Sequence, residues 1–250
     1  MLIRRVIPVL DIRRGRLVKG VQFGDLQDAG DPVQAGCLYA SMGADALIAL
    51  NLSRSEAHTA RYVEIIREMV QRSGVPVIAG GGVRTLNAFE SLLMAGASAV
   101  SVATQAIRDP GFVTRAAQTF GSERVMGAVD VRWAGNGWRV HSHGGLRNTL
   151  LDALDWCAEL ERRGAGQLML VSMDRDGTGS GFDTDLVRYV HERVRVPLVV
   201  NGGAGTVEDF VEACLAGATA VTAASLFHFR HLTIGEVKEG LHREGFAVSQ

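Results

Sequence analysis

Two aspartates, Asp11 and Asp130, each end a run of apolar residues, in the segments IPVLD and MGAVD. Two carboxyl groups that face one substrate can act as general acid and general base when their surroundings push their pKa values apart. A single aspartate at such a position can instead cap the turn that follows it. Because two aspartates occupy matched positions, we predict that Asp11 and Asp130 form an acid–base pair.

Glycine-rich segments follow three further apolar runs: GGG at 80–82, DGTGSG at 176–181 and NGGAG at 201–205. Backbone N–H groups in such turns approach a phosphate closely, and a following helix N-terminus adds partial positive charge. We predict two phosphate sites, one in each half of the chain, and a long ligand with a phosphate at each end. The first-half site is Gly81, Gly82 and Thr104, and the second-half site is Asp176, Gly177, Thr178, Gly202, Gly203, Ala224 and Ser225.

Lys19 lies in a long segment, RRGRLVKGVQFGDLQDAGD, which we expect to form a loop. It is either a mobile catalytic or anion-binding group or a solvated loop lysine, and we keep it as a third catalytic candidate. The seven histidines and three cysteines have no metal-ligand spacing, and no dinucleotide-binding fingerprint opens a helix. We therefore expect neither a metal nor an organic cofactor.

The elements that must position these residues alternate between strands and helices. Continuous apolar strands separated by amphipathic helices indicate a parallel sheet covered by helices. Eight such units in 250 residues favour a (βα)8 TIM barrel over a doubly wound sheet, which more often has five or six strands. In such a barrel the active site lies at the C-terminal ends of the strands. The predicted strands are 6–10, 47–50, 76–79, 99–102, 125–129, 167–171, 197–200 and 220–223.

An internal repeat supports the barrel. The segment GGVRTLNAFESLLMAGASAVSVAT, which starts at Gly81, aligns without a gap on GGAGTVEDFVEACLAGATAVTAAS, which starts at Gly202. We predict a duplicated (βα)4 half-barrel, with halves at about 1–120 and 121–245, that closes into a single domain over 1–250. A loop or small hairpin is expected at 133–143.

Composition narrows the function classes. The chain is 47% apolar and 21% charged, with a net charge of −1, so it forms a globular core and has no basic patch for nucleic acid. The N-terminal apolar run is too short for a signal peptide or a membrane span. We therefore expect a cytoplasmic protein without a nucleic-acid or membrane partner.

Several motifs together resemble one known family over nearly the whole chain: RRVIPVLDIRRGRLVKGV, GGGVR, HGGLRNT, DRDGTGSGFDTD, NGGAG and AASLFHF. They are similar to the cyclase subunit of imidazole glycerol phosphate synthase, an enzyme of histidine biosynthesis. The resemblance implies a (βα)8 barrel in which Asp11 and Asp130 are acid and base. It further implies a bis-phosphorylated ribulosylformimino aminoimidazole carboxamide ribonucleotide as substrate. Ammonia would arrive through the barrel from a glutaminase subunit, and the products would be imidazole glycerol phosphate and aminoimidazole carboxamide ribotide.

The chain departs from the family at four positions near the expected mouth. The resemblance implies Asp, Asn, Thr and Ser where this chain has Asn51, Ala103, Val171 and Asn201. Each change alters a polar group at the mouth, so a related reaction on another phosphosugar stays open.

Departures are more numerous at the opposite end of the barrel, where the resemblance implies a ring of charged residues that gates the passage of ammonia. The resemblance implies Arg, Glu, Lys and Glu in this ring; this chain retains Arg5 but has Ala46, Ala99 and Gln167 at the other three positions. Near the surface where the glutaminase would dock, it has Ser98 and Glu123 where the resemblance implies Asp and Gln. Without the three charges the salt-bridged gate cannot form, while the core stays stable. We therefore hypothesise a diverged paralogue with weakened or absent glutaminase coupling.

Four functions were compared. The ammonia-adding cyclase and lyase leads because both aspartates, Lys19 and most of the glycines are present. A diverged paralogue acting on a related phosphosugar in a specialised pathway comes second, and a phosphosugar isomerase third. A non-catalytic binding module comes last, because such a module would not require both aspartates.

Overall fold

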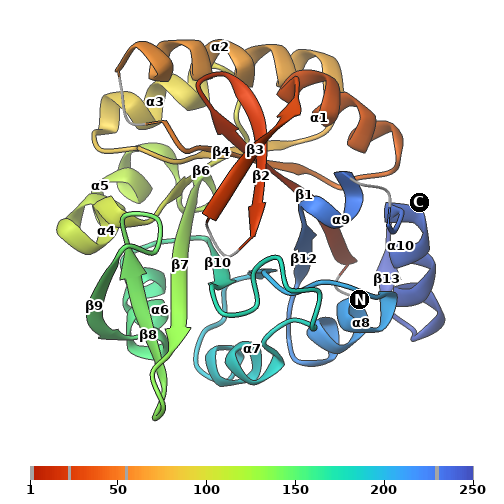
Figure 1. Ribbon diagram of the computed structural model, residues 1–250. Coiled ribbons are helices and arrows are strands. Elements are labelled where there is room, and N and C mark those ends of the chain that lie inside the picture. The colour runs from red at the N-terminus through yellow and green to blue at the C-terminus, as the bar shows by residue number, and fades with distance from the viewer. Residues whose placement is uncertain (1–2, 22–23, 54–55, 229–230, 250) are drawn as a thin grey trace.

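Eight parallel strands close into a barrel in the computed structural model, which describes residues 3–21, 24–53, 56–228 and 231–249. Each strand pairs with the next in the chain, and the last, β12, pairs with β1. The predicted (βα)8 barrel is therefore confirmed, with all eight predicted strands present (Figure 1). The barrel strands are β1 (Ile3–Arg13), β4 (Leu47–Asn51), β5 (Val77–Gly80), β6 (Ala99–Val102), β7 (Val125–Trp133), β10 (Gln167–Ser172), β11 (Leu198–Asn201) and β12 (Ala220–Ala223).

Helices surround the barrel (Figure 1). Among the described residues, none of them is long and apolar enough to cross a lipid bilayer. They are α1 (Pro32–Ser41), α2 (Glu56–Ser73), α3 (Leu86–Met94), α4 (Thr104–Arg108), α5 (Gly111–Phe120), the 3-10 turn η1 (Ser122–Arg124), α6 (Ala153–Arg162), α7 (Thr184–His191), α8 (Val207–Leu215), α9 (Ser225–His228) and α10 (Ile234–Arg243).

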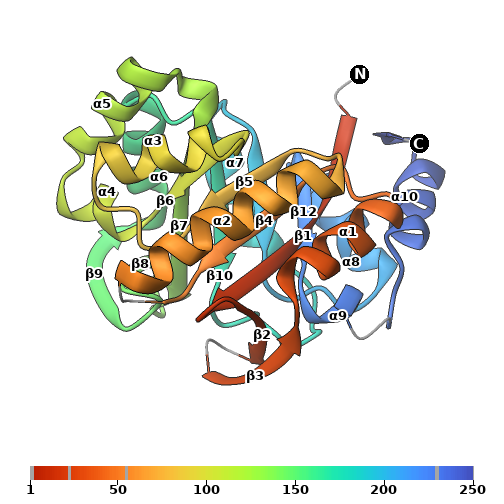
Figure 2. The ribbon, with the colours of Figure 1, turned by 90° about the horizontal axis from the view of Figure 1, so that it is seen from above.

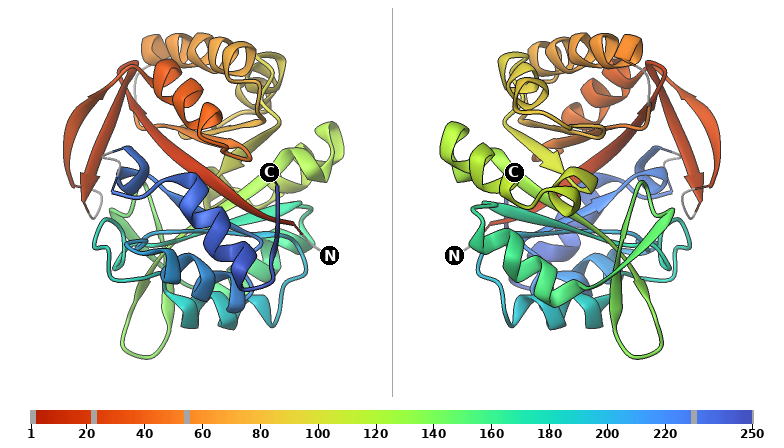
Figure 3. Two further views of the ribbon diagram at one scale, coloured as in Figure 1. Left: turned by 90° about the vertical axis from the view of Figure 1, so that its right-hand side faces the viewer. Right: turned by 90° about the vertical axis from the view of Figure 1, so that its left-hand side faces the viewer.

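Antiparallel strands extend the barrel at its mouth. The segment after β1, expected to be a loop, instead forms β2 (Arg16–Val21) and β3 (Gly24–Gly30). The hairpin expected at 133–143 is present, and β9 (Arg147–Asp152) adds a strand beside β8 (Trp138–Ser142). These strands are hard to recognise because their short segments mix polar and apolar residues and pair beyond the apolar runs of β1 and β7. Figures 2 and 3 show both hairpins on one side of the barrel and the N-terminus on the opposite side. On the side of the N-terminus, β13 (Ala247–Val248) pairs with β1.

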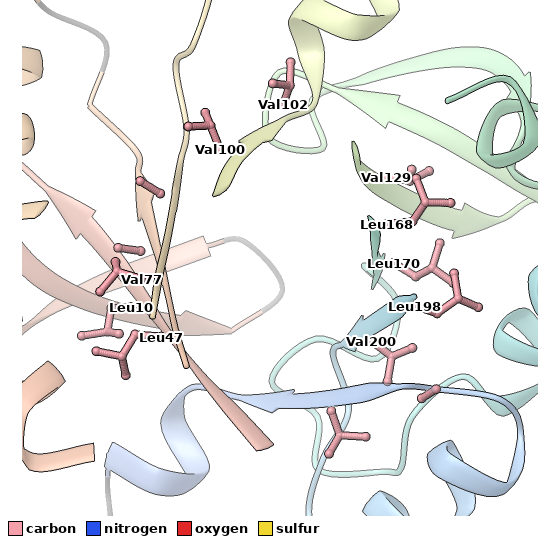
Figure 4. Close-up of a cluster of buried hydrophobic side chains, with 14 of the residues drawn as sticks. Leu10, Leu47, Val77, Val100, Val102, Val129, Leu168, Leu170, Leu198 and Val200 are labelled. Atoms are coloured by element: carbon pink, nitrogen blue, oxygen red, sulfur yellow. The ribbon is translucent and has the colours of Figure 1, made fainter. Parts of the chain in front are cut away.

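Two separate apolar layers hold the fold together. One fills the barrel interior and includes Ile7, Ile48, Met126, Met169 and Val199. The other lies between the strands and the surrounding helices, and Figure 4 shows part of it. Because successive side chains on a strand point to opposite faces, each strand contributes to both layers. Continuous apolar strands are the result, which is why the sequence pattern indicated a parallel barrel.

The bounds of several elements recur at the offset of 121 residues. It relates β5 to β11, α3 to α8 and β6 to β12, residue for residue. The N-caps correspond as well: the side chain of Thr85 accepts from Ala88 N, and that of Thr206 from Asp209 N. Such bonds satisfy N–H groups that have no partner within a helix.

Tyr62 on α2 ties two barrel strands together beneath the first glycine-rich turn. Its hydroxyl donates to the carbonyl oxygen of Ala49 at 2.7 Å and accepts from the backbone N–H of Gly80 at 3.1 Å. The ring is 2% exposed, and burial raises the pKa of this phenol far above its usual value. The bridge holds the ends of β4 and β5 at a fixed separation, immediately before Gly81.

We expect Tyr62→Phe to lower the free energy of unfolding by about 1–3 kcal/mol, because it leaves a buried N–H and a buried carbonyl without this partner. Denaturant unfolding of both proteins measures the difference. Tyr189→Phe is a suitable control because that ring lies at the surface, and it should change stability by less than about 0.5 kcal/mol. An equally small effect at Tyr62 would contradict the bridging role.

Candidate active site

Asp11 and Asp130 occupy opposite walls of the barrel mouth. Asp11 is on β1 and Asp130 on β7, and three strands separate β1 from β7 in each direction around the ring. Asp11 pairs in register with Leu50, and Asp130 with Val171. Both side chains are partly buried. The two carboxyl groups can therefore approach one ligand from opposite sides.

Asp130 lies in surroundings that favour its neutral form. Burial is the main cause, and the nearby carboxylate of Asp176 adds to it; together they raise the pKa of Asp130 from 3.8 to about 7. An acid with this pKa holds its proton in much of the population at neutral pH and can still release it. Asp176 thus has an electrostatic effect on Asp130, in addition to its predicted place at the second-half site.

The pKa of Asp130 makes stability depend on pH. Because the folded protein binds this proton more tightly than the unfolded chain, stability falls as the pH rises from about 4 to about 7. We expect Asp130→Asn to be more stable than the wild type at about pH 8, by up to about 4 kcal/mol, and to lose this advantage near pH 4. Urea unfolding at several pH values measures it. Asp185→Asn, a change at an exposed carboxylate, serves as control and should give no such pH trend.

Close backbone contacts explain the glycines of the first-half site. Gly81 and Gly82 have φ values of +83° and +72°, which favour glycine. A Cβ atom on Gly81 would lie 2.3 Å from the carbonyl oxygen of Asn51, so no other residue fits without a shift of the backbone. Asn51 is 5% exposed, and its Oδ1 accepts from Ser53 N at 2.9 Å. Asn51, at a position where the resemblance implies an aspartate, therefore stabilises the turn after β4.

The glycines of the second half allow two loops to pack directly on each other. The backbone N–H of Gly181 donates to the carbonyl oxygen of Gly203 at 2.8 Å. A Cβ atom on Gly203 would lie 2.1 Å from the carbonyl oxygen of Gly181, and one on Gly202 would lie 2.6 Å from that of Ser172. The segment DGTGSG, which follows β10, and the segment NGGAG, at the end of β11, therefore form one continuous surface.

The other members of the second-half site line the same side of the barrel. Gly177 has a φ of +69°, and the hydroxyl of Thr178 donates to the carbonyl oxygen of Arg175 at 2.7 Å, within its own loop. Ala224 packs against the interior layer at the end of β12. Ser225 begins α9, but its side chain lies outside the described part of the structure.

Lys19 lies on β2, where its backbone pairs with Gln27 of β3. Its side chain also lies outside the described residues, so its catalytic role stays a prediction. Thr104 begins α4 and is partly buried. It follows β6 just as Ser225 follows β12, so the two predicted phosphate sites have equivalent positions in the barrel.

The remaining changed positions make the mouth less polar on one side. Val171 is 6% exposed and lies between Asp130 and Asn201 in the strand register. The Oδ1 atom of Asn201 accepts from the hydroxyl of Thr222 at 2.6 Å. Ala103 precedes α4 and provides no side-chain cap. Val171 next to Asp130 adds apolar surroundings that keep water away from that carboxyl group.

The opposite end of the barrel is lined by small and uncharged side chains. Ala46 and Ala99 are each 2% exposed within the interior layer, and Gln167 is partly buried at the start of β10. Arg5 is partly buried too, and burial lowers the pKa of its guanidinium, while the carboxylate of Asp45 opposes this shift. Of these four predicted gate positions, only Arg5 carries a charge.

The two docking positions lie at the start of β6 and in η1. The hydroxyl of Ser98 donates to the carbonyl oxygen of Val77 at 3.1 Å, so it satisfies the backbone of its own barrel. Glu123 is exposed, and its nearest described partner is Arg124 at 3.9 Å.

Sequence reasoning missed three residues at the mouth: Arg108, His141 and His143. In the register of β7 and β8, His141 lies directly opposite Asp130, so both side chains face the same side of the sheet. Arg108 and His143 are hydrogen-bonded to each other beside Thr104. The expected loop or small hairpin at 133–143 and the motif HGGLRNT pointed to this segment, but nothing in its spacing indicated which elements it contacts.

This geometry defines a class: a (βα)8 barrel with paired carboxyl groups and glycine-lined turns at one mouth. The family described as "Histidine biosynthesis protein" matches residues 5–233, and the chain belongs to that family. Proteins named imidazole glycerol phosphate synthase subunit HisF are similar over almost the full length. The one from Gluconacetobacter diazotrophicus is 47% identical over 249 residues, covering 99% of this chain and 96% of the relative.

Two further relatives carry the same name. The protein from Mycobacterium tuberculosis is 46% identical, covering 98% of this chain and 94% of the relative. The protein from a Thermotoga species is 41% identical, covering 99% and 98%. Similarity of this extent includes both halves of the barrel and every strand end described above.

Proposed function

We propose that this protein is the cyclase of imidazole glycerol phosphate synthase and acts in histidine biosynthesis. It adds ammonia to a bis-phosphorylated ribulosylformimino aminoimidazole carboxamide ribonucleotide. The products are imidazole glycerol phosphate and aminoimidazole carboxamide ribotide. The observation that carries the proposal is the position of Asp11 and Asp130 on opposite strands of one mouth, between two glycine-lined turns. The names of the relatives support it.

The raised pKa of Asp130 indicates how the two aspartates divide the work. Asp130, with a pKa of about 7, is the general acid and donates a proton to the ribulosyl carbonyl oxygen as ammonia attacks the carbonyl carbon. Asp11, on the opposite wall, is the general base that removes a proton from the bound nitrogen. Loss of water from this adduct gives an imine. The imine nitrogen then bonds to the formimino carbon, and the bond between that carbon and the amino nitrogen of the carboxamide ribotide breaks. The departing amine takes up the two protons that the imine nitrogen and the neighbouring CH2 group lose as the imidazole ring becomes aromatic.

Two glycine-lined turns suit a substrate with a phosphate at each end. Backbone N–H groups bind phosphate oxygens without steric hindrance where no Cβ is present. Anchoring both ends places the reacting carbonyl between the aspartates, which lowers the entropic cost of reaching the transition state. The relatives favour this reaction over a related reaction on another phosphosugar, over a phosphosugar isomerase and over a non-catalytic binding module.

We expect Asp11→Asn and Asp130→Asn each to lower kcat at least about 100-fold with ammonium chloride as nitrogen source, because each loses a group that transfers a proton. Turnover of the ribulosyl substrate is followed by the loss of its absorbance and by product analysis. Asp185→Asn is the control and should retain activity, since this carboxylate is exposed on α7. Unchanged turnover in either active-site variant would show that the assignment of acid and base is wrong.

We also propose a nitrogen source and a location. The relatives are named as subunits, which supports a partner, and the reaction suggests that this partner is a glutaminase that supplies ammonia. A biosynthetic enzyme of this kind works in the cytoplasm. The uncharged barrel floor at Ala46, Ala99 and Gln167 lacks the side chains for a salt-bridged gate. We infer that glutaminase activity and cyclase activity are only weakly coupled in this protein.

Weak coupling predicts a low ratio of glutamine-dependent to ammonia-dependent turnover, measured after mixing the protein with a glutaminase subunit of the same enzyme class. The triple change Ala46→Glu, Ala99→Lys and Gln167→Glu supplies the missing charges and should raise this ratio by about 10-fold, if a charged gate contributes about 1.4 kcal/mol to coupling. Ammonia-dependent turnover is the internal control. A ratio of glutamine-dependent to ammonia-dependent turnover near one in the wild type would contradict weak coupling.

A further inference from the structure

Arg108, His143 and Thr104 form a hydrogen-bonded cluster where the turn after β8 meets α4. The Nη2 atom of Arg108 lies 2.9 Å from Nε2 of His143, and the backbone N–H of His143 donates to Oγ1 of Thr104 at 2.9 Å. On the other side of the ring, Nδ1 of His143 lies 2.9 Å from Oγ of Ser142. Figure 1 shows β8 running beside β7 toward α4. The cluster thus attaches the hairpin of β8 and β9 to the first-half site.

Hydrogen-bond chemistry determines which of these groups carries charge. Arginine can only donate, so Nε2 of His143 accepts and its Nδ1 carries the proton, which it donates to Ser142. The imidazole is therefore neutral in this arrangement. Arg108 is the charged member of the cluster, and its bond to His143 uses one of five N–H donors.

The backbone of His143 has a conformation that a side chain rarely adopts. Its φ is +60°, and Gly144 and Gly145 follow with φ values of +66° and +82°. A residue other than glycine in this region is uncommon and is held there by its surroundings. The bonds to Arg108 and Thr104 are such surroundings, so they keep the turn after β8 next to Thr104.

The members of the first-half site offer a phosphate no positively charged side chain. Gly81, Gly82 and Thr104 are neutral, whereas a phosphate monoester carries about −1.5 to −2 at pH 7. Arg108 lies four residues after Thr104, one turn further on α4, and its side chain is exposed. Charge-assisted bonds from a guanidinium to phosphate are among the strongest that side chains form.

We propose that Arg108 and His143 make the first-half site selective for a phosphate group. Arg108 is the binding residue that supplies the positive charge. His143 is a positioning residue that holds Thr104 and the turn after β8 in place. This inference rests on the proposed function, because it assigns one of the two substrate phosphates to this end of the mouth.

Kinetics of three variants test the proposal. Arg108→Gln keeps a donor for His143 but removes the charge, and should raise KM for the ribulosyl substrate and lower kcat/KM, each at least about 10-fold. Arg108→Lys restores the charge and should recover most of the affinity. His143→Gly accommodates the positive φ without the imidazole and should raise KM about threefold. Arg115→Gln is the matched control, since Arg115 is an exposed arginine paired with Asp109.

A second measurement separates this proposal from the proposed function. Inorganic phosphate titrated into the protein in a calorimeter should bind at two sites in the wild type and at one in Arg108→Gln. If Arg108→Gln binds one phosphate fewer than the wild type, but the wild type does not turn over the ribulosyl substrate, the cyclase function is rejected and this proposal is retained. An unchanged KM in active Arg108→Gln, phosphate binding that the change does not affect, or a wild type that binds no phosphate would overturn it.

Discussion

Closure of the parallel strands into a ring is the constraint on which the rest of the structure depends. All eight strands run in the same direction, so their carboxyl ends meet at one mouth. Pairing of β12 with β1, and of β10 with β7, leaves no free edge between the barrel strands. Residues more than a hundred positions apart in the chain, such as Asp11 and Asp130, therefore face a common space.

Close approach of backbone segments is the second feature that the site depends on. The glycine-rich turns are rigid because each packs on a neighbouring strand or loop, as Gly81 does on Asn51 and Gly203 on Gly181. Tyr62 holds β4 and β5 together directly before the first of these turns. The turns can therefore present their N–H groups in a fixed arrangement, which is what selective phosphate binding requires.

Burial favours the protonated form of Asp130 at the mouth. Asp130 has a raised pKa because surrounding groups exclude water and because Asp176 repels its charged form. Apolar Val171 contributes to these surroundings from the neighbouring strand. An apolar side chain at that position favours the neutral form of the acid. The uncharged residues Ala46, Ala99 and Gln167 lie at the other end of the barrel.

The sequence by itself determined the barrel and the candidate acid–base pair. Eight apolar runs and a repeat at 121 residues are local patterns, and they place Asp11, Asp130 and the glycines at strand ends. It did not reveal the strands β2, β3 and β9, because these short segments mix polar and apolar residues without a regular alternation. Only the tertiary structure decided that Asp130 has a raised pKa, and that His143 meets Thr104 and Arg108. Desolvation and contacts between distant segments depend on how the elements pack, and no spacing along the chain encodes them.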